Sequence, residues 1–451
     1  DVLARAGFVW PRRHQTLRTA IGWSHELCAP LERLLWARLT VFRGSFDLAS
    51  ARAVTSGGPL AAEDVQPVLE RLVAQCVVRR DGDRYRMLDT IREYGEEWLR
   101  ELGEDAELAR RHAQHFTGLA RWAESSWVGS EQTHCYRMVE AAHTDLRTAL
   151  DHWLAEDPRQ AAELAGLLVF FWTCCGHLKE ARTYLERALA AGPAPGPART
   201  RALIALSVTV TLQGEYALAA ELSREAVGAA AEDGDKEAQL GAAYAAGLLG
   251  LLLGESEQAR TMVTDTLAAV PGFAFDSPAR LRCHLVQVFA LTALGEFDEA
   301  QALAVELRQH SAQTGEIWTR SYLDYQLSLI ALLRGAPHAA VTHARAMLES
   351  KRLLGDAFGI ALGLDLLAAA LAADGAAEQA ASVYGTGAAF WRSVGHPQRG
   401  TPELRAVREQ CEATARAALG ERAYATAYAR GSASHDMAVL AEMLVPPPEA
   451  R

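Results

Sequence analysis

The stretch VFALTALGEFDEA, residues 288–300, joins two chemically different segments at a single glycine. Apolar residues dominate before Gly295, and charged residues follow it until Ala300. Glycine adopts the left-handed conformation that ends helices without a steric penalty, and the small alanine lets the following helix lie close to the first. The stretch therefore predicts a hairpin of two helices.

A glycine followed five residues later by an alanine occurs six times in the second part of the chain, 38 to 41 residues apart. Mostly small residues also stand seven positions before each glycine, as a close helix crossing requires. A supersecondary unit repeated at a fixed period is typical of a solenoid, so we expect six stacked hairpins. The six segments are GHLKEA from Gly176, GEYALA from Gly214, GESEQA from Gly254, GEFDEA from Gly295, GAPHAA from Gly335 and GAAEQA from Gly375.

These repeats resemble the tetratricopeptide repeat in their glycine, aromatic and alanine positions, with Tyr216 and Phe297 at the aromatic position. The usual period of that family is about 34 residues, so longer helices or connections are expected here. The resemblance implies a superhelix in which the first helix of each hairpin lines a concave binding face.

The first hundred residues have a different order of elements. Amphipathic spacing predicts one helix from Arg13 and another after Pro30, and two shorter helices follow. Residues 76–88 predict two short strands around the tight-turn signal DGD at 81–83, before a further helix at about 90–102. Helices, a hairpin and a helix in this order indicate a winged-helix-like unit.

The sequence thus predicts a mainly α protein, in which a winged-helix-like adaptor is followed by an α-helical solenoid of tetratricopeptide-like hairpins. The expected parts are an N-terminal tail (1–12), the winged-helix-like domain (13–103), a helical linker (104–158), the solenoid of six hairpins (159–385), and a helical C-terminal cap with a Pro-rich tail (386–451).

The net charge of −11 on this 451-residue chain is unevenly distributed. Residues 1–100 hold 15 arginines and 13 acidic residues, whereas the remainder holds 30 basic and 43 acidic residues. Phosphate affinity comes from Lys and Arg, so any DNA contact is expected in the first hundred residues. No apolar run is long enough for a membrane span, and seven cysteines without a CxxC pair indicate reduced thiols and a cytoplasmic location.

No motif of a familiar active site is present. The sequence lacks the P-loop pattern GxxxxGK[ST] as well as HExxH, GxSxG and GxGxxG, and no histidine pairs with Cys, Asp or Glu at a metal-ligand spacing. We therefore expect no enzyme activity, no catalytic or metal-binding residues, and no cofactor held by this chain itself.

Three segments resemble the region that follows the nucleotide-binding module in bacterial STAND-class regulators. That class includes large LuxR-family regulators and the ATPase-bearing antibiotic regulatory proteins of actinobacteria. The family pattern RH-x-TLR-x-AI-x-WS, leading into E-x-x-L-x-x-LxVFxGxF, is matched within residues 13–51. RYRMLDTIREYG (84–95) is similar to the strand-to-helix edge of the family's winged helix, and EAAHTDLRTALDHWL (140–154) to the lead into its repeats. The matching positions of the first segment are Arg13, His14, Thr16, Leu17, Arg18, Ala20, Ile21, Trp23, Ser24, Glu32, Leu35, Leu39, Val41, Phe42, Gly44 and Phe46.

The resemblance implies a sensor and autoinhibitory region of a transcriptional regulator. The solenoid would bind an effector protein, peptide or small molecule and relay this through the winged helix to a nucleotide-binding module in cis. ATP or ADP would then act only through that module, which is absent from this chain, and DNA would be contacted only indirectly. A homo-oligomer is compatible with this class, and no membrane partner is expected. Leu88 stands where related switch ATPases carry a phosphate-reading histidine, and leucine cannot donate a hydrogen bond.

Two other functions remain open at this point. The chain can be a free-standing tetratricopeptide scaffold for protein interactions, or the winged helix can bind DNA directly.

Five arginines gather in and just after the expected hairpin. They suit three roles, which are phosphate contact with DNA, docking onto the nucleotide-binding module, and a charged strand edge that prevents strand pairing. They are Arg79, Arg80, Arg84, Arg86 and Arg92.

Aligning the repeats on their glycines selects a second set of candidate residues on the concave face. Mixed aromatic and charged side chains there suit a peptide or small effector, although aromatic residues at this spacing are also typical of inter-repeat core. The selected residues are Phe170, Tyr244, Arg282, Phe289, Tyr322, Tyr325 and Asp365.

Overall fold

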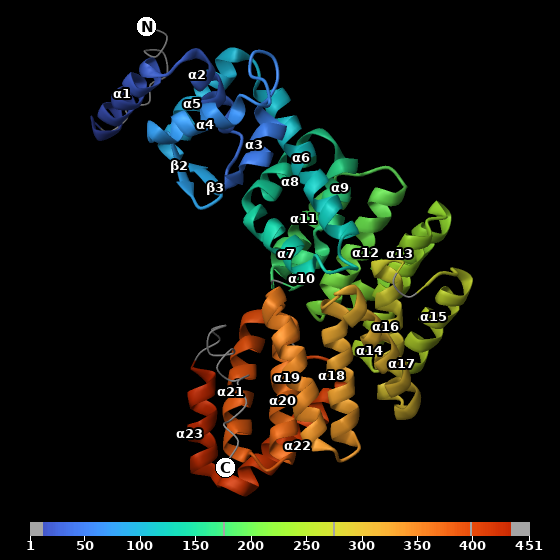
Figure 1. Ribbon diagram of the computed structural model, residues 1–451. Coiled ribbons are helices and arrows are strands. Elements are labelled where there is room, and N and C mark those ends of the chain that lie inside the picture. Colours follow the sequence, from blue (N-terminus) through green and yellow to red (C-terminus); the bar gives the residue numbers. More distant parts are fainter. Residues whose placement is uncertain (1–11, 175, 274–275, 397–398, 434–451) are drawn as a thin grey trace. The chain divides into compact units, whose positions relative to one another are not determined.

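The computed structural model describes residues 12–174, 176–273, 276–396 and 399–433 (Figure 1). The chain divides into two compact units. Unit 1 comprises residues 1–120 and 138–156, and unit 2 comprises residues 121–137 and 157–451. The expected tails, apart from Arg12, lie outside the described residues.

Unit 1 combines short helices with one small sheet. The chain changes unit inside α6 (Asp105–Ser125), inside α7 (Gln132–Ala141) and again after Glu156. The other elements of unit 1 are α1 (Arg12–Leu27), α2 (Pro30–Leu39), β1 (Phe46–Asp47), α3 (Leu48–Thr55), α4 (Val65–Ala74), β2 (Val78–Asp81), β3 (Arg84–Met87), α5 (Asp89–Leu102) and α8 (His143–Glu156).

The predicted hairpin is present as β2 and β3, which pair antiparallel with Val78 opposite Met87. Gly82 in the turn has a φ of +60°, which explains why a glycine is needed there. Strand β1 pairs with the other edge of β3 through Phe46 and Tyr85, so the sheet order is β1-β3-β2. The Phe46 and Tyr85 rings stack with centroids 6.0 Å apart and form part of the core.

Residues 104–158, expected as a helical linker, are divided between the two units. Asp145 of α8 is fully buried in unit 1, where its carboxylate accepts the backbone N–H groups of Arg43 at 2.7 Å and Gly44 at 3.2 Å. His112 Nε2 lies 3.1 Å from the same carboxylate. A Cβ at position 44 would lie 2.9 Å from Asp145 Oδ2, so glycine is required at this close approach.

Unit 2 is built from helices throughout its described residues. None of the described helices in either unit is long and apolar enough to cross a membrane. The helices of unit 2 beyond residue 157 are α9 (Pro158–Leu167), α10 (Val169–Cys174), α11 (Leu178–Ala190), α12 (Pro197–Leu212), α13 (Tyr216–Asp233), α14 (Lys236–Leu253), α15 (Ser256–Ala269), α16 (Pro278–Ala293), α17 (Phe297–Thr314), α18 (Trp318–Leu333), α19 (Pro337–Leu354), α20 (Ala357–Ala373), α21 (Ala377–Val394), α22 (Pro402–Leu419) and α23 (Glu421–Ser432).

The six predicted hairpins are confirmed at their glycines and alanines. The six glycines have φ values between +74° and +86°, and the second helix of each hairpin begins two residues later. The alanines of the pattern are at most 3 % exposed. Ser328, seven positions before Gly335, donates its hydroxyl to the carbonyl of Ala340 at 2.7 Å and so links the two helices of its hairpin. The alanines are Ala181, Ala219, Ala259, Ala300, Ala340 and Ala380.

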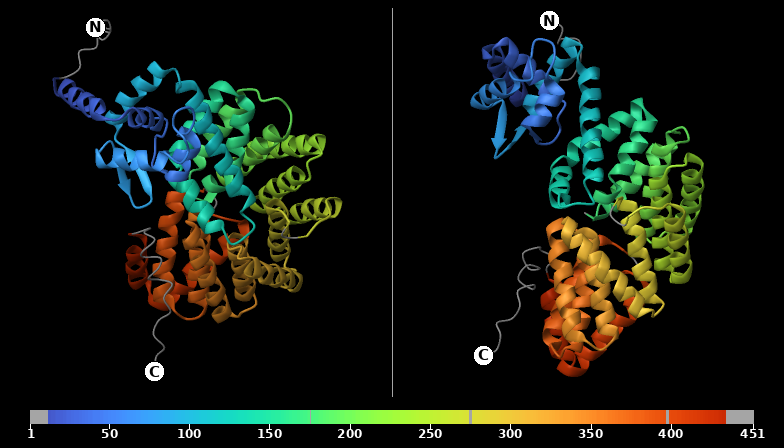
Figure 2. Two further views of the ribbon diagram at one scale, coloured as in Figure 1. Left: turned by 45° about the horizontal axis from the view of Figure 1, so that its top comes forward. Right: turned by 45° about the vertical axis from the view of Figure 1, so that its right-hand side comes forward.

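Successive hairpins from α12 to α17 lie side by side (Figures 1 and 2), and α20 also lies against α10 of the first hairpin. Cys174 of α10 belongs to the same buried cluster as Leu285 of α16, Leu323 of α18 and Leu362 of α20. The first helices of early and late repeats therefore meet in one core, and the concave side is largely filled. The mainly α class and the solenoid are confirmed.

Enlarging a buried alanine of the repeat should open its hairpin. Ala300 packs between Leu291 of α16 and Ile330 of α18 with no exposed surface. Ala300→Leu should therefore lower the free energy of unfolding by about 1 to 3 kcal/mol through overpacking. Chemical unfolding followed by circular dichroism measures this. Ala302→Leu, at an exposed site of the same helix, is the matched control and should stay within about 0.5 kcal/mol of the wild type.

Candidate functional site

A cavity of about 140 Å³ lies inside the solenoid of unit 2. The first helix of every one of the six hairpins contributes to its wall, as do the loops before α20 and before α22. Representative wall residues are Phe170 (α10), Val208 (α12), Tyr244 (α14), Phe289 (α16), Tyr322 (α18) and Leu362 (α20). The wall is therefore assembled from segments that are far apart in the sequence.

Six of the seven residues selected from the repeat alignment line this one cavity. The exception is Asp365, which is buried elsewhere in the α20 core. The six residues are Phe170, Tyr244, Arg282, Phe289, Tyr322 and Tyr325. Tyr322 and Tyr325 are also buried members of the solenoid core, so wall and core are the same residues here.

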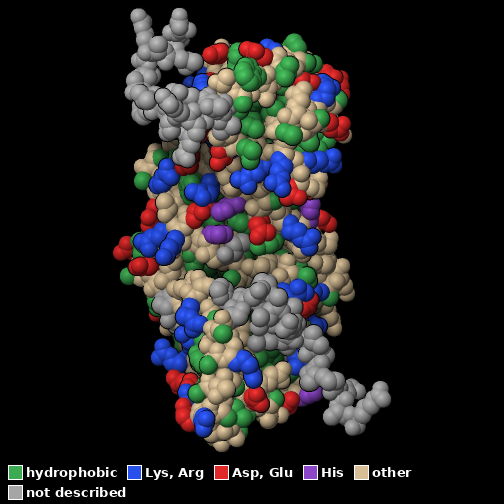
Figure 3. Space-filling view, turned by 90° about the vertical axis from the view of Figure 1, so that its left-hand side faces the viewer, with side chains coloured by type: hydrophobic (Ala, Val, Ile, Leu, Met, Phe, Trp, Pro, Cys, Tyr) green, Lys and Arg blue, Asp and Glu red, His purple; other side chains and the backbone are tan. Residues whose placement is uncertain are grey.

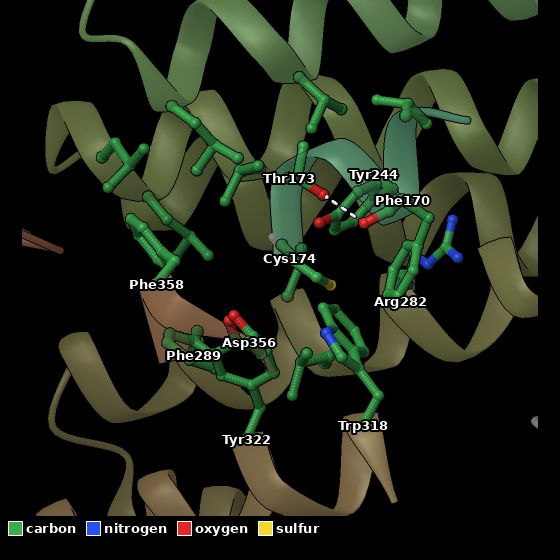
Figure 4. A pocket seen from close by; sticks show the side chains of 18 of the residues that line it. Phe170, Thr173, Cys174, Tyr244, Arg282, Phe289, Trp318, Tyr322, Asp356 and Phe358 are labelled. Atoms are coloured by element: carbon green, nitrogen blue, oxygen red, sulfur yellow. Dashed lines mark hydrogen bonds between the residues drawn. The ribbon is translucent and has the colours of Figure 1, made fainter. Parts of the chain in front are cut away.

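Aliphatic and aromatic side chains form most of the wall, and several of the aromatic rings contact one another. The Phe170 and Trp318 centroids are 4.9 Å apart in an edge-to-face arrangement, and those of Trp318 and Tyr322 are 4.8 Å apart. Phe289 stacks on Tyr325 at 5.7 Å. Figure 4 shows Phe170 and Tyr244 on one side of the cavity and Trp318 and Tyr322 on the other. Such geometry holds the walls apart and favours flat apolar occupants.

Arg282 is the cation of this wall. Its guanidinium carbon lies 4.5 Å from the Phe170 centroid and 5.9 Å from the Tyr244 centroid (Figure 4). The side chain is half-buried, and among the described residues no carboxylate forms an ion pair with it. An arginine in this setting has its charge stabilised only by rings and solvent, so it is free to bind an anion.

A buried ion pair that the sequence reasoning missed stands beside the cavity. Lys351 Nζ lies 2.6 Å from Asp356 Oδ2, and both side chains are at most 2 % exposed. The ammonium is also 3.4 Å from the Tyr322 centroid and 4.8 Å from that of Trp318. Asp356 itself lines the cavity and also caps α20 by accepting the Gly359 N–H at 2.9 Å. The rarity of lysine could have drawn attention to this residue, because Lys351 is one of only three lysines in the chain.

Two polar atoms of the wall side chains have no hydrogen-bond partner among the described residues. They are the Tyr325 hydroxyl and Trp318 Nε1, on side chains 1 % and 7 % exposed. Burial raises the pKa of Tyr244 to about 12 and also raises the pKa of Tyr322 and of Tyr325. All three phenols therefore stay protonated near neutral pH and can donate hydrogen bonds.

A segment preceding the repeats is attached to the same walls. We call residues 121–137 the strap. Gln132 in the strap is fully buried and accepts the N–H groups of Ile317 at 2.7 Å and Trp318 at 2.9 Å. Its amide nitrogen donates to Glu316 Oε1 at 2.7 Å, and Glu316 in turn caps the start of α18. The start of α18, which carries Trp318, is thus tied to the strap.

The strap reaches two further parts of the wall. Trp127 packs on Phe170 with ring centroids 4.2 Å apart. Tyr136 packs against Gly355, where a Cβ would lie 2.8 Å from the ring, next to Asp356. Three wall elements therefore contact this short segment.

Asp365 has a structural environment in the C-terminal part of the solenoid. Its Oδ2 accepts the Trp391 indole N–H at 2.8 Å and lies 3.6 Å from the Arg408 guanidinium. Burial raises the pKa of this carboxyl to about 6 despite the nearby arginine. It is placed away from the cavity and joins α20 to α21 and α22.

The five hairpin arginines have different surroundings in the fold. Arg84 donates to Ser45 Oγ at 2.8 Å, Arg80 to the carbonyl of Gly82 at 2.9 Å, and Arg92 pairs with Asp89 at 2.7 Å. Arg79 and Arg86 are exposed and lie directly opposite each other on β2 and β3, without an ion-pair partner in the described part of the chain. Basic and acidic side chains are intermixed on the molecular face in Figure 3.

A second hollow, of about 280 Å³, lies in unit 1 and is lined by charged as well as apolar residues. Arg43 of its lining pairs with Glu96, and His112 contacts Asp145. Among the described residues, no group of three or more His, Cys, Asp or Glu is placed to hold a metal ion. The cavity of unit 2 is therefore the better candidate for a ligand site.

Part of the chain is similar in sequence to bacterial proteins that are named as regulators. A segment of 187 residues, 40% of this chain, is 36% identical to proteins of Mycobacterium bovis and Mycobacterium tuberculosis that are provisionally named HTH-type transcriptional regulators. The matched segment spans only 20% of the length of those relatives. Uncharacterized proteins of the same two organisms are 41% identical over 106 residues, which is 22% of this chain and 27% of theirs. No family model matches the chain.

The fold resembles that of a solved sensor protein. The crystal structure of a signal-transduction ATPase with numerous domains (STAND), with a tetratricopeptide repeat sensor, from Pyrococcus horikoshii aligns with 97% of this chain and 68% of its own. The TM-score is 0.53 at 13% sequence identity. The solenoid is thus of the tetratricopeptide-like kind.

The Asp365 carboxyl should make stability depend on pH. Its folded-state pKa of about 6 lies above the ordinary value of 3.8, so ionisation costs stability as the pH rises through 4 to 6. Asp365→Asn removes this cost. The variant should match the wild type at pH 4 and exceed its unfolding free energy by about 2 kcal/mol at pH 8, measured by urea unfolding at both pH values. Asp374→Asn, at the exposed end of the same helix, should show no such pH-dependent difference.

Proposed function

We propose that this chain is the sensor and autoinhibitory region of a STAND-type transcriptional regulator of the large LuxR-family kind. An effector binds inside the solenoid, and its binding is relayed through the winged-helix-like part of unit 1 to a nucleotide-binding module. That module supplies any ATP or ADP chemistry, and the present chain acts by binding alone in the cytoplasm. The sequence likeness to transcriptional regulators and the fold likeness to a STAND sensor support this proposal.

The attachment of the strap to the cavity wall is the observation that carries the proposal. Phe170, the start of α18 at Trp318 and the turn at Gly355 all contact the strap. Along the chain, the strap continues at both ends into unit 1, through α6 and α7. A shift of the wall on ligand binding therefore acts on a segment that is covalently joined to unit 1 on both sides.

Such a relay requires a ligand with different affinities for two states of the solenoid. The wall residues supply a physical basis for two states. An empty cavity leaves Tyr325 and Trp318 without hydrogen-bond partners, whereas an occupant with acceptor atoms satisfies them. The occupied state is then more tightly packed, and the strap follows the wall that it contacts.

Unit 1 has features suited to docking a neighbouring module. Trp23 and Leu27 of α1 are 66% and 85% exposed, and Leu88 at the end of the hairpin is 58% exposed. The unpaired Arg79 and Arg86 lie on the same hairpin. Trp23 thus differs from Trp36, which is buried. In the proposed regulator, these exposed side chains contact the nucleotide-binding module in cis.

The relay can be tested by filling the cavity with a side chain. Val208 of α12 lines the cavity, and Val208→Phe places a ring in it. We expect the exchange protection of amides in residues 12–103 to change by about fivefold or more, because the strap shifts with the wall. Hydrogen exchange with mass spectrometry on the full chain measures this, and Gln132→Ala should abolish the response.

Val227→Phe on α13, an exposed site outside the cavity, is the matched control and should leave residues 12–103 unchanged. Leu248→Phe, which reshapes the wall with little added volume, is a milder second variant if Val208→Phe lowers the stability too far. Unchanged protection in both wall variants would contradict the relay and favour a free-standing interaction scaffold. The coding sequence upstream of Asp1 separates the same alternatives, since the regulator requires a P-loop there.

Direct DNA binding is the second candidate, because Arg79 and Arg86 form a like-charge cross-strand pair that nothing neutralises in the described structure. Docking in cis predicts that the full chain causes no DNA mobility shift even at low salt. It also predicts that Arg79→Glu raises the unfolding free energy by about 0.5 kcal/mol by creating an opposite-charge pair. A low-salt shift that disappears in Arg79→Ala/Arg86→Ala, but not in Arg260→Ala/Arg352→Ala on the solenoid, would establish DNA binding instead.

A further inference from the structure

The size of the cavity in unit 2 limits its occupant to a small molecule. Its volume of about 140 Å³ is close to that of an engineered cavity of about 150 Å³ that binds benzene. Sites for drug-sized ligands usually measure about 300 to 1,000 Å³. One or two rings with a short substituent therefore fit, whereas a folded partner or a peptide backbone does not.

The shape and chemistry of the wall favour an aromatic body. Phe170, Trp318 and Tyr322 present ring faces and edges at 4.8 to 4.9 Å from one another. Phe289 and Phe358 extend this apolar lining across the cavity (Figure 4). A flat ring gains both apolar burial and edge-to-face contacts among these aromatic side chains, which we call the aromatic box.

The charges of the wall disfavour a cationic occupant. Two cations already lie over the rings, Lys351 over Tyr322 and Arg282 over Phe170. The carboxylate of Asp356 is already bound by Lys351 Nζ at one oxygen and by the Gly359 N–H at the other. A further ammonium would meet repulsion from both cations and no available carboxylate, because electrostatic interactions strengthen in a low-dielectric cavity.

The same charges favour an anion. The Lys351 and Asp356 charges cancel, which leaves Arg282 as the uncompensated charge of the wall. Trp318 and Tyr325, which also line the cavity, carry an N–H and an O–H without a partner among the described residues. A guanidinium with free N–H groups binds a carboxylate with two parallel hydrogen bonds.

We propose that the cavity binds a small aromatic carboxylic acid in its ionised form. One or two rings occupy the aromatic box, and the carboxylate accepts hydrogen bonds from the Arg282 guanidinium. This inference rests on the proposed function, of which it names the effector class. Arg282 is both the anchor of the acid and the group that distinguishes it from neutral and cationic analogues.

The test uses the purified full chain and four matched probes, titrated by calorimetry and by thermal shift. Phenylacetate should bind at least about tenfold more tightly than phenylacetamide, because only the carboxylate pairs with a guanidinium. Phenethylamine, which carries the opposite charge, and acetate, which has no ring, should not bind at the concentrations that saturate with phenylacetate. Binding of 1-naphthylacetate tests the two-ring limit.

Variants assign the effect to the proposed residue. Arg282→Leu should weaken phenylacetate binding by about tenfold or more and leave phenylacetamide binding unchanged. Arg282→Lys keeps the charge and should retain part of the affinity, which shows that the fold survives substitution at this site. Arg334→Leu is the matched control, since Arg334 also lies over a ring, 5.8 Å from the Phe297 centroid, but outside the cavity. It should bind phenylacetate like the wild type.

Several outcomes would overturn the proposal. These are equal binding of acid and amide, preferential binding of the amine, no binding of either acid up to about 10 mM, and unchanged phenylacetate affinity in Arg282→Leu. Hydrogen exchange in residues 12–103 separates this result from the relay. If phenylacetate binds but hydrogen exchange in residues 12–103 does not change, the relay is contradicted and the ligand class stands. If the amide or the amine, and not the acid, changes hydrogen exchange in residues 12–103, the ligand class is contradicted and the relay stands.

Discussion

The close approach of two helices at a left-handed glycine and a buried alanine is the constraint on which the solenoid depends. Each of the six alanines lies against the first helix of its own hairpin with almost no exposed surface, and Ser328 links the helices of one pair by a hydrogen bond to Ala340. Because this contact recurs every 38 to 41 residues, each hairpin presents its first helix toward the same side. The large side chains of those helices must then share one interior.

The cavity is a consequence of that shared interior. Aromatic residues of the first helices fill most of the concave side, and their rings are too rigid to close the remaining space. Two internal cations lie over these rings, and a carboxylate compensates Lys351 but not Arg282. Polar groups retained in such a setting cost stability when unpaired. The ligand proposed above would pair with Arg282, the cation that lacks a carboxylate partner among the described residues.

Within unit 2, the strap is hydrogen-bonded to a helix that forms part of the cavity wall. Gln132 satisfies two backbone N–H groups at the start of α18, a helix that follows it by more than 180 residues. A buried amide with this many partners fixes the position of Trp318 relative to the strap, because an unsatisfied buried donor is expensive. The strap and the start of α18 thus belong to the same polar network.

The sequence by itself determined the helical hairpins, the β2-β3 hairpin and six cavity-lining residues among the seven candidates, but not the pairing of β1 with β3. These features follow from local conformational preference and from periodicity, both of which can be read along the chain. The tertiary structure alone decided that α10 meets α20 and that Lys351 pairs with Asp356 beneath Tyr322. It also decided that Asp365 contacts Trp391 and Arg408 instead of the cavity. Such contacts depend on the summed rotation between successive hairpins, and no single repeat encodes that rotation.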